Sequence, residues 1–248
     1  MSPKYTAHAN RTFALVVPTL NEAGNISALL KALTQVLATT PHDYEILVVD
    51  DGSTDGTVEE VQQWSLLDPR VRLISRTGER GLAGAVLYGW RHSRADLLGV
   101  IDADLQHPPD LLPHLLREAE RADIVVASRY AQEDGLKGWN PLRAVISKMS
   151  TLAATPLISR RNLTCTDPMS GFFVMHRHCI CNISFQTAGF KLLLEILCRG
   201  HIRKIREVPY HFGIRQAGRS KASAAVALDY LTLLGRLSRD LVLRSSAS

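Results

Sequence analysis

Two aspartates and a glutamine are spaced two residues apart in the string DADLQHP, as Asp102, Asp104 and Gln106. The string directly follows an apolar run, and on an extended backbone residues two apart point to the same side. Carboxylate and amide oxygens are the ligands that Mg²⁺ and Mn²⁺ prefer. The sequence therefore predicts a Mg²⁺ or Mn²⁺ site here; the alternative is that the aspartates only cap the helix that follows.

Two further acidic residues also come directly after apolar runs: Glu22 in PTLNE and Asp51 in DDGSTDG. Each carboxylate can accept a hydrogen bond from a nucleotide base or ribose, although each can equally form a turn or cap a helix. The chain has no GxxxxGK[ST] loop and no GxGxxG string after a predicted strand. Without a glycine loop that binds phosphate, we expect a cation to neutralise a bound diphosphate.

Buried strands alternate with amphipathic helices in the first half of the chain. The apolar runs predict strands over residues 12–20, 45–49, 71–75, 97–101 and 124–127. Helices are predicted after a cap at Asn25, after Gly56, over 83–92 and over 111–122. This alternation indicates an α/β fold with a parallel, doubly wound sheet. Its strands end at one edge, so PTLNE, DDGSTDG, DADLQHP and SRY are expected to converge there.

The second half has weaker periodicity and carries more basic residues. We predict helices over 138–158 and 191–200, strands over 171–177 and 206–212, and a final helix over 225–243. That last helix has leucines on one side, at Leu228, Leu231, Leu234 and Leu241, and arginines toward its end. No Gly/Ser-rich or Pro-rich linker separates the halves, so we expect one domain with a C-terminal extension.

Composition and charge limit the classes of protein to which the chain can belong. The 46% hydrophobic content and mean hydropathy of −0.01 exclude a disordered chain and a polytopic membrane protein. Residues 1–136 carry 12 Lys and Arg against 19 Asp and Glu, whereas residues 137–248 carry 17 against 5. A segregated charge of this kind favours two different partners over nucleic acid.

We expect a cytoplasmic protein, because the sequence shows no recognisable signal peptide and has few cysteines. The first apolar run is too short for a signal peptide, and no run reaches the ~20 apolar residues of a membrane span. The four cysteines are expected to be reduced thiols. The string HRHCIC, residues 176–181, holds four side chains that can bind zinc, but its crowded spacing does not favour a zinc site.

Six strings, taken together, resemble a known family. PTLNEAGNI, VVDDGSTDGT, IDADLQHPP, ASRY, DPMSGF and FGIRQAGRSK occur in this order between Thr12 and Lys221. This combination resembles the family 2 glycosyltransferases, in particular the dolichol- or polyprenol-phosphate mannose synthases. The resemblance implies a GT-A fold, a nucleotide-sugar donor such as GDP-mannose, and a polyprenyl phosphate acceptor. It also implies inverting transfer of a hexose at the cytosolic face of the membrane.

The same resemblance assigns site residues in three groups. It places the nucleoside at Pro18, Leu20, Glu22, Val49, Asp51, Ile101 and Ala103. It places the metal at Asp102, Asp104 and Gln106, with Asp104, Arg129 and Arg215 in catalytic roles and Asp102 also in contact with the substrate. It places the phosphates of acceptor and donor against Arg129, Arg143, Ser147, Arg215 and Lys221.

These roles divide the chain into regions with different partners. Residues 1–221 are expected to form a single GT-A domain, with a nucleotide and metal half at 1–136 and an acceptor half at 137–221. Residues 222–248 are expected to form an amphipathic interfacial helix that attaches the protein peripherally to the membrane surface, alone or with a membrane partner protein.

Three alternatives remain open on the sequence. The first is a UDP-sugar-dependent polyprenyl-phosphate glucosyltransferase or a related family 2 enzyme. The second is a catalytically inactive, membrane-associated regulator. The third is a soluble glycosyltransferase that acts on a sugar or protein acceptor.

Overall fold

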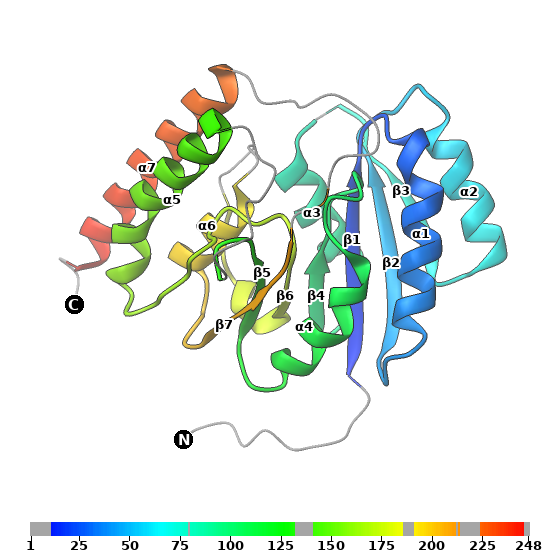
Figure 1. Ribbon diagram of the computed structural model, residues 1–248, viewed down its shortest axis with the longest axis horizontal. Coiled ribbons are helices and arrows are strands. Elements are labelled where there is room, and N and C mark those ends of the chain that lie inside the picture. Colours follow the sequence, from blue (N-terminus) through cyan, green and yellow to red (C-terminus); the bar gives the residue numbers. More distant parts are fainter. Residues whose placement is uncertain are drawn as a thin grey trace.

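Figure 1 shows a mixed sheet with helices on both faces and a pair of long helices at one side. This computed structural model describes residues 11–78, 80–131, 141–185, 191–211, 213 and 224–245. Within these, the side chains of residues 141–147, 224–229 and 241–245 are not described.

The elements follow the predicted order closely. The strands are β1 Thr12–Thr19, β2 Asp43–Asp50, β3 Val71–Ser75, β4 Leu97–Val100, β5 Ile124–Ser128, β6 Phe173–His176 and β7 Ile205–Pro209. The helices are α1 Ala23–Leu37, α2 Thr57–Leu67, α3 Leu82–Arg91, α4 Leu112–Ala119, α5 Pro141–Ser159, α6 Leu192–Arg199 and α7 Ala224–Ser245. Short 3₁₀ turns cover Pro109–Leu111 and Arg177–Ile180.

The described strands form one seven-stranded sheet in the order β3-β2-β1-β4-β6-β5-β7. All neighbouring pairs are parallel except those of β6, which runs antiparallel to both β4 and β5. The order reverses between β1 and β4, and in open α/β sheets ligands bind beyond the carboxyl ends of the strands at such a point. The topology therefore directs attention to the loops after β1 and β4.

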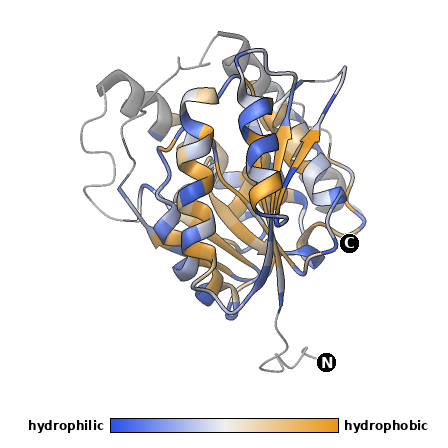
Figure 2. Cartoon of the chain, turned by 90° about the vertical axis from the view of Figure 1, so that its right-hand side faces the viewer, coloured by the Kyte–Doolittle hydropathy of each residue, from blue (hydrophilic) through white to orange (hydrophobic). Residues whose placement is uncertain are grey.

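The sheet separates two hydrophobic cores because alternate strand residues face opposite sides. In β1, Phe13, Leu15 and Val17 pack in the core under α1 and α4. Ala14 and Val16 face the other core, which is covered by α3, α5 and α6. Figure 2 shows the interior strands as a largely hydrophobic layer behind helices with hydrophilic outer sides. Both faces of the central strands are buried, which explains their continuous apolar sequence.

Helix α1 begins earlier than its sequence predicts. Asn25 does not cap the helix; it lies in the first turn, buried, and its Nδ2 donates to Glu22 Oε2 at 3.0 Å. Glu22 occupies the cap position, and its carbonyl accepts the N–H groups of Asn25 and Ile26. The prediction of Asn25 as cap was therefore wrong, because Glu22 and Asn25 together order the first turn.

Helices α5 and α7 pack side by side at one side of the molecule (Figure 1). Tyr230 Oη donates to the carbonyl of Ser150, and Arg199 of α6 pairs with Asp240 of α7. Leu233 and Leu237 are buried against the protein, whereas Leu231 is 62% exposed. Leu234 packs partly buried against the same core, so the predicted row of leucines meets the protein at Leu234 and the surface at Leu231.

No helix in the described part of the chain is long and apolar enough to cross a membrane. Large hydrophobic side chains are exposed at Met149 and Leu152 of α5 and Leu231 of α7, and also at Leu66 and Leu67 of α2.

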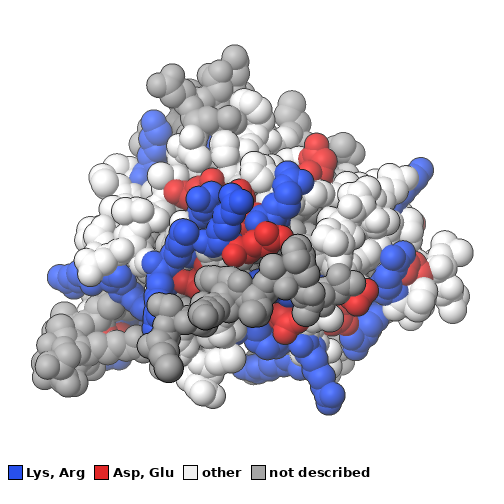
Figure 3. All heavy atoms as spheres, turned by 90° about the horizontal axis from the view of Figure 1, so that it is seen from below, with Lys and Arg blue, Asp and Glu red and all other residues white. Residues whose placement is uncertain are grey.

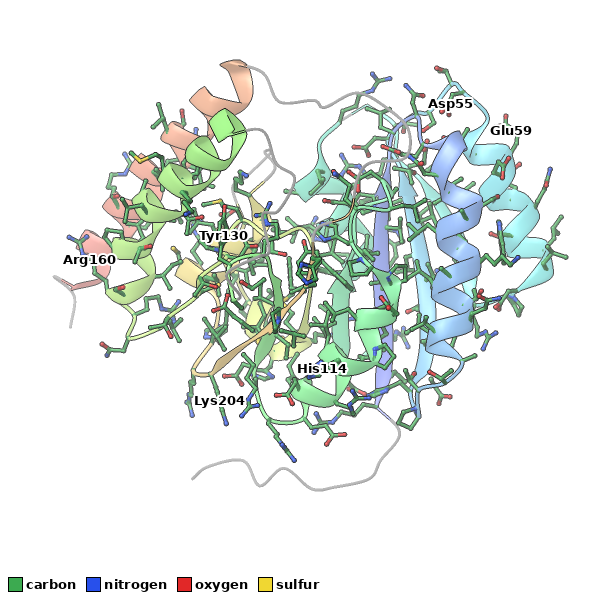
Figure 4. All side chains as sticks on the ribbon, in the orientation of Figure 1. Asp55, Glu59, His114, Tyr130, Arg160 and Lys204 are labelled. Atoms are coloured by element: carbon green, nitrogen blue, oxygen red, sulfur yellow. The ribbon has the colours of Figure 1, made fainter. Side chains whose placement is uncertain are left out.

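Charged side chains lie near both ends of the strands. Figure 4 shows Asp55, in the loop after β2, at the upper edge, and Lys204, just before β7, at the lower edge. Figure 3 looks at the molecule from below and shows acidic and basic side chains interspersed on that face. Ion pairs such as Arg206–Glu118 join residues of the two halves of the chain. The charge separation along the sequence thus does not appear as separate acidic and basic patches on this face.

Candidate active site

The loops after β1 and β2 are joined by hydrogen bonds at the carboxyl edge of the sheet. Asn21 donates its N–H to Ser53 Oγ at 2.8 Å and accepts the N–H of Thr54 on Oδ1 at 2.9 Å. Glu22 donates its N–H to Thr57 Oγ1 at 2.8 Å. Asn21 has a φ of +59°, a conformation that asparagine tolerates better than most residues. The strings PTLNE and DDGSTDG therefore form one connected structure.

The two aspartates at the end of β2 have different partners. Asp50 is buried and accepts hydrogen bonds from Thr19 Oγ1, the N–H groups of Gly52 and Ser53, and Ser53 Oγ. Asp51 follows it, and its Oδ2 accepts the Gly81 N–H at 2.8 Å while its Oδ1 lies 3.1 Å from Arg76 Nε. Asp50 thus organises the loop, and the protein orients Asp51 from both of its oxygens.

Close packing holds Arg76 in place beside Asp51. Only 8% of the Arg76 side chain is exposed, and a Cβ on Gly84 would lie 2.7 Å from one guanidinium nitrogen. Because Gly84 has no side chain, the Arg76 guanidinium fits beside it.

The loop after β4, which we call the β4 loop, contains Asp102 to His107. Its backbone turns at Ala103 and Asp104, and Leu105 has a φ of +59°. The extended backbone expected for this string was therefore wrong. Asp104 is buried and its Oδ1 accepts the N–H of Gln106 at 3.1 Å, so this hydrogen bond spans the turn between two of the three predicted ligands.

The donor set of the β4 loop fits a hard cation. Asp102 Oδ1 is buried without a hydrogen-bond partner in the described residues, which is costly for a carboxylate unless a ligand satisfies it. Gln106 Nε2 donates to the carbonyl of Gly213 at 3.1 Å, so the amide oxygen is not used in that bond. Within the described chain, no group of three or more His, Cys, Asp or Glu side chains is arranged to hold a metal. A cation here would need further oxygen ligands, such as those of a diphosphate.

Arg129, at the end of β5, is held by a buried carboxylate. Its Nε and terminal nitrogen donate to both oxygens of Asp167 at 2.8 and 2.7 Å, and its N–H donates to Asp167 as well. Burial acts to lower the pKa of Arg129, but the hydrogen bonds and charge of Asp167 outweigh it and raise the pKa. Glu207 of β7 in turn accepts the N–H groups of Thr166 and Asp167. Arg129 is therefore rigid and remains a cation.

Sequence patterns gave little reason to assign a functional role to four residues near this site: His107, Tyr210, Asp167 and Lys191. His107 and Tyr210 are buried and hydrogen-bonded to each other, and Asp167, whose sequence suits a turn equally well, is fully buried. Burial lowers the pKa of Lys191 and the charge of Arg129 adds to the shift, while Asp167 and Asp102 oppose it. The sequence suggests a surface pair of Lys191 with Glu195, but Glu195 is buried and pairs with Arg199 at 3.4 Å.

The other predicted site residues fall into three groups. Pro18 and Leu20 are partly exposed at the end of β1, whereas Val49, Ile101 and Ala103 are buried in the two cores. Arg143 and Ser147 lie in α5, but their side chains are not described. Arg215 and Lys221 lie outside the described residues.

The HRHCIC string has structural contacts. His176 Nε2 lies 2.9 Å from the Ala119 carbonyl, and Cys179 Sγ donates to the Asp123 carbonyl. Burial lowers the pKa of His176 and raises that of Cys179 to about 12, which keeps both neutral at ordinary pH.

Comparison with known proteins identifies the family. The sequence pattern of the family described as Glycosyl transferase family 2 matches residues 14–181. The chain belongs to glycosyl transferase family 2. It is therefore a glycosyltransferase, which confirms the resemblance drawn from the six strings and the enzyme class it implies.

Several curated members of the family are similar to nearly the whole chain. A dolichol-phosphate mannosyltransferase of Pyrococcus furiosus is 37% identical over 226 residues, which are 90% of this chain and 63% of that protein. Those of Mycosarcoma maydis and Saccharomyces cerevisiae are each 36% identical and cover 96% and 91% of this chain. The match takes in 83% and 86% of those two proteins.

Solved structures support the fold. Mannosyl-3-phosphoglycerate synthase from Rubrobacter xylanophilus superposes with a TM-score of 0.67 at 20% identity, over 95% of this chain and 75% of that one. Glucosyl-3-phosphoglycerate synthase from Mycobacterium tuberculosis, solved with Mn²⁺, UDP-glucose and phosphoglyceric acid, gives 0.63 at 21% identity, over 91% and 80%. The predicted α/β GT-A fold, with a mostly parallel sheet flanked by helices, is thereby confirmed.

Proposed function

We propose that this family 2 glycosyltransferase transfers mannose from GDP-mannose to a polyprenyl, dolichyl-type monophosphate, with inversion at the sugar and with Mg²⁺ or Mn²⁺. The observation that carries the proposal is the similarity, at 36–37% identity over at least 90% of this chain, to three proteins named dolichol-phosphate mannosyltransferase. The donor, the acceptor and the metal are inferred from that similarity and from the chemistry of the site.

The donor nucleoside is proposed to bind across the loops after β1 and β2, at Pro18, Leu20, Glu22 and Asp51. The hydrogen bond from Gly81 and the charge of Arg76 hold the Asp51 carboxylate before any ligand arrives. A pre-oriented acceptor loses little conformational entropy on binding, which favours a specific contact with the base. Val49, Ile101 and Ala103 are proposed to support this pocket from the cores.

The donor diphosphate is proposed to lie against the β4 loop. Asp102, Asp104 and Gln106 would hold the cation, which when bound supplies charge to the diphosphate and its leaving group. Arg129, kept cationic by Asp167, is proposed to add a fixed positive charge on the donor side. These residues bind and orient the donor; none of them is required as a base.

The acceptor supplies its own nucleophile. A phosphate monoester has a second pKa of ~6, so at neutral pH it already carries an anionic oxygen. The problem for the protein is to bring this anion next to the donor diphosphate. We propose that Arg143 and Ser147 bind the acceptor phosphate, because a guanidinium suits paired contacts to phosphate oxygens. Arg215, in a catalytic role, and Lys221 are proposed to bind the phosphates of both acceptor and donor.

The membrane surface is proposed to lie against the α5–α7 pair, on the cytosolic side. Met149, Leu152 and Leu231 expose apolar side chains there, and apolar residues on an interfacial helix bind at the boundary of headgroups and acyl chains. In this proposal residues 1–136 form the donor half, residues 137–221 the acceptor half, and residues 222–248 the interfacial helix, alone or with a membrane partner protein.

The test is a panel of GDP- and UDP-sugars offered with a short polyprenyl phosphate and Mn²⁺, scored for glycosylated anionic lipid. Product from GDP-mannose alone supports the proposal. Product only from a UDP-sugar replaces it with a polyprenyl-phosphate glucosyltransferase or a related enzyme. Transfer to a sugar or protein in place of the lipid supports a soluble glycosyltransferase, and no transfer in any arm supports an inactive regulator.

A further inference from the structure

His107, the last residue of the β4 loop, lies between Asp102 and Tyr210. Its side chain is only 4% exposed, and its Nε2 lies 3.4 Å from Asp102 Oδ2. Its Nδ1 lies 2.8 Å from the hydroxyl oxygen of Tyr210, which follows directly after β7. Three residues from two distant parts of the sequence thus form a buried chain that ends on a predicted metal ligand.

The chemistry of the three groups assigns the protons in this chain. A carboxylate only accepts hydrogen bonds, so a hydrogen bond to Asp102 requires the imidazole hydrogen on Nε2. Nδ1 then has a lone pair and accepts the hydroxyl hydrogen of Tyr210. Burial raises the pKa of Tyr210 well above its ordinary value, and the charges of Asp167, Asp102 and Asp104 add to this while Arg129 opposes it. The phenol therefore keeps the proton that it donates.

Packing on both sides limits how His107 and Asp102 can move. The His107 ring contacts Phe172 edge-to-face, with ring centroids 5.5 Å apart. On the other side of the carboxylate, a Cβ added to Gly171 would lie 2.5 Å from Asp102 Oδ2. Oδ2 is thus enclosed by His107 and Gly171, whereas Oδ1 is buried without a hydrogen-bond partner in the described residues. One oxygen is supported by the protein and the other is left for a ligand.

A second connection joins the same two segments. The N–H of Gly213 donates to the Gln106 carbonyl at 2.9 Å, and Gln106 Nε2 donates back to the Gly213 carbonyl at 3.1 Å. The segment after β7 therefore contacts Gln106 directly and reaches Asp102 only through His107. Outer hydrogen bonds of this kind orient metal-binding side chains and alter metal affinity by ~10 to 100-fold.

We propose that His107, oriented by Tyr210, is a positioning residue that holds the Asp102 carboxylate in the orientation that binds a divalent cation. The inference rests on the proposed cation site and adds to it the residues that set its affinity. The 3.4 Å contact is longer than an ordinary N–H···O hydrogen bond, and such contacts often shorten only when a ligand is bound.

The experiment measures Mn²⁺ binding directly, by the electron paramagnetic resonance signal of unbound Mn²⁺, with Mn²⁺ alone and again with GDP. His107→Asn keeps an acceptor near Nδ1 but loses the donor to Asp102, whereas His107→Gln places an amide donor near the Nε2 position. We expect Mn²⁺ to bind His107→Asn ~10 to 100-fold more weakly than the wild type, and His107→Gln to restore most of the affinity. Tyr210→Phe, which removes only the hydroxyl, should weaken binding by a smaller factor.

Controls separate positioning from folding and from loss of any histidine. His114→Asn removes an exposed histidine of α4 and should leave Mn²⁺ affinity unchanged. Thermal unfolding without metal should agree between His107→Asn and His107→Gln. At saturating Mn²⁺ the transfer rate of His107→Asn should recover toward that of the wild type.

Two results would overturn the positioning role of His107. One is wild-type Mn²⁺ affinity in His107→Asn; the other is an equal loss of affinity in His107→Gln and His107→Asn. Either result, if the wild-type protein binds Mn²⁺, leaves the proposed metal site intact. A wild-type protein that binds no Mn²⁺, with or without GDP, overturns the proposed metal site and this inference together.

Discussion

Two aspartates lie at the end of β2 and two more lie in the β4 loop, both after buried strands, yet the contacts of their carboxylates differ. Asp50 accepts four hydrogen bonds, from Thr19 and from the loop that follows β2. Asp102, in contrast, has one oxygen beside His107 and the other buried without a partner in the described residues.

The difference shows that aspartates in similar sequence strings can have different roles, one in stabilising the fold and the other in binding a ligand. A carboxylate whose oxygens are all satisfied by the protein stabilises the local fold. A buried oxygen without a donor in the described residues carries a desolvation cost that a bound ligand can remove, and such groups are expected at functional sites. Asp50 and Asp102 thus predict opposite consequences of mutation, one on stability and the other on activity.

The largest effect is expected at Asp102. Asp102→Asn keeps the size of the side chain but removes its charge, so metal-dependent transfer should fall by at least ~100-fold. Thermal unfolding without metal should change by no more than ~2 °C, because no hydrogen bond within the described part of the chain depends on Oδ1. Transfer assays and calorimetry on the same preparation check this. A large loss of stability with little loss of specific activity would reverse the contrast between the loops.

Asp50→Asn is expected to do the opposite. An amide in place of this carboxylate turns one acceptor into a donor that faces the Thr19 and Ser53 hydroxyls, which should lower the free energy of unfolding by about 2 kcal/mol. Mn²⁺ affinity of the folded protein should be unchanged. Denaturant unfolding and Mn²⁺ titration measure the two quantities, and unaltered stability would show that Asp50 does not organise the loop.

Gly171→Ala probes the β4 loop without changing any of its residues. The added methyl would overlap Asp102 Oδ2, and since the end of a side chain can move aside, the stability cost should stay within ~1 kcal/mol. Mn²⁺ affinity should fall ~10-fold because the carboxylate is displaced.

Gly235→Ala is the matched control for Gly171→Ala. Position 235 lies in α7 with nothing within 4 Å of the added Cβ, so the helix should gain up to ~1 kcal/mol. Its Mn²⁺ affinity should not change. Equal metal affinity in Gly171→Ala and Gly235→Ala would contradict the account of how Asp102 is held.

The smallest effect is a pH dependence in the β2 loop. Burial acts to raise the pKa of Asp55, but hydrogen bonds from Thr57 Oγ1 and the N–H groups of Ala23 and Thr57 outweigh it and lower the pKa. A lowered pKa in the folded state stabilises the protein above the unfolded value of ~3.9, and this contribution disappears as the pH falls through the folded pKa.

The test compares wild type with Asp55→Asn. The melting temperature of Asp55→Asn should lie slightly below that of the wild type at pH 7, and the gap should close below pH ~4. A gap that stays constant down to pH 3 would show that the charge of Asp55 does not contribute. Mn²⁺ affinity should be equal in the two proteins at pH 7.

The strands and the edge of the sheet that carries the site could be predicted because they depend on local patterns. Continuous apolar runs such as TFALVVPT are buried on both faces, and the polar strings that follow them end at one edge. The antiparallel direction of β6 could not be predicted, because a four-residue apolar strand has the same pattern in either direction.

The contacts that complete the site depend on residues far apart in the sequence. Tyr210 and His107 are 103 residues apart, and Asp167 and Arg129 are 38 apart. No periodicity relates such pairs, and a buried histidine or an aspartate before proline has several common structural uses. The alternation argument for Asp102 and Asp104 failed for a related reason, since the backbone turns directly after the strand. Arg143, Ser147, Arg215 and Lys221 remain predictions.

The central claim is that the β4 loop holds a cation needed for sugar transfer to a lipid phosphate. The most direct test measures mannose transfer from GDP-mannose to a short polyprenyl phosphate, first with a chelator and then as Mn²⁺ is returned. We expect no product with the chelator, full recovery with Mn²⁺, and no recovery in Asp102→Asn. Product formed at the same rate with the chelator present, or full recovery in Asp102→Asn, would contradict the account.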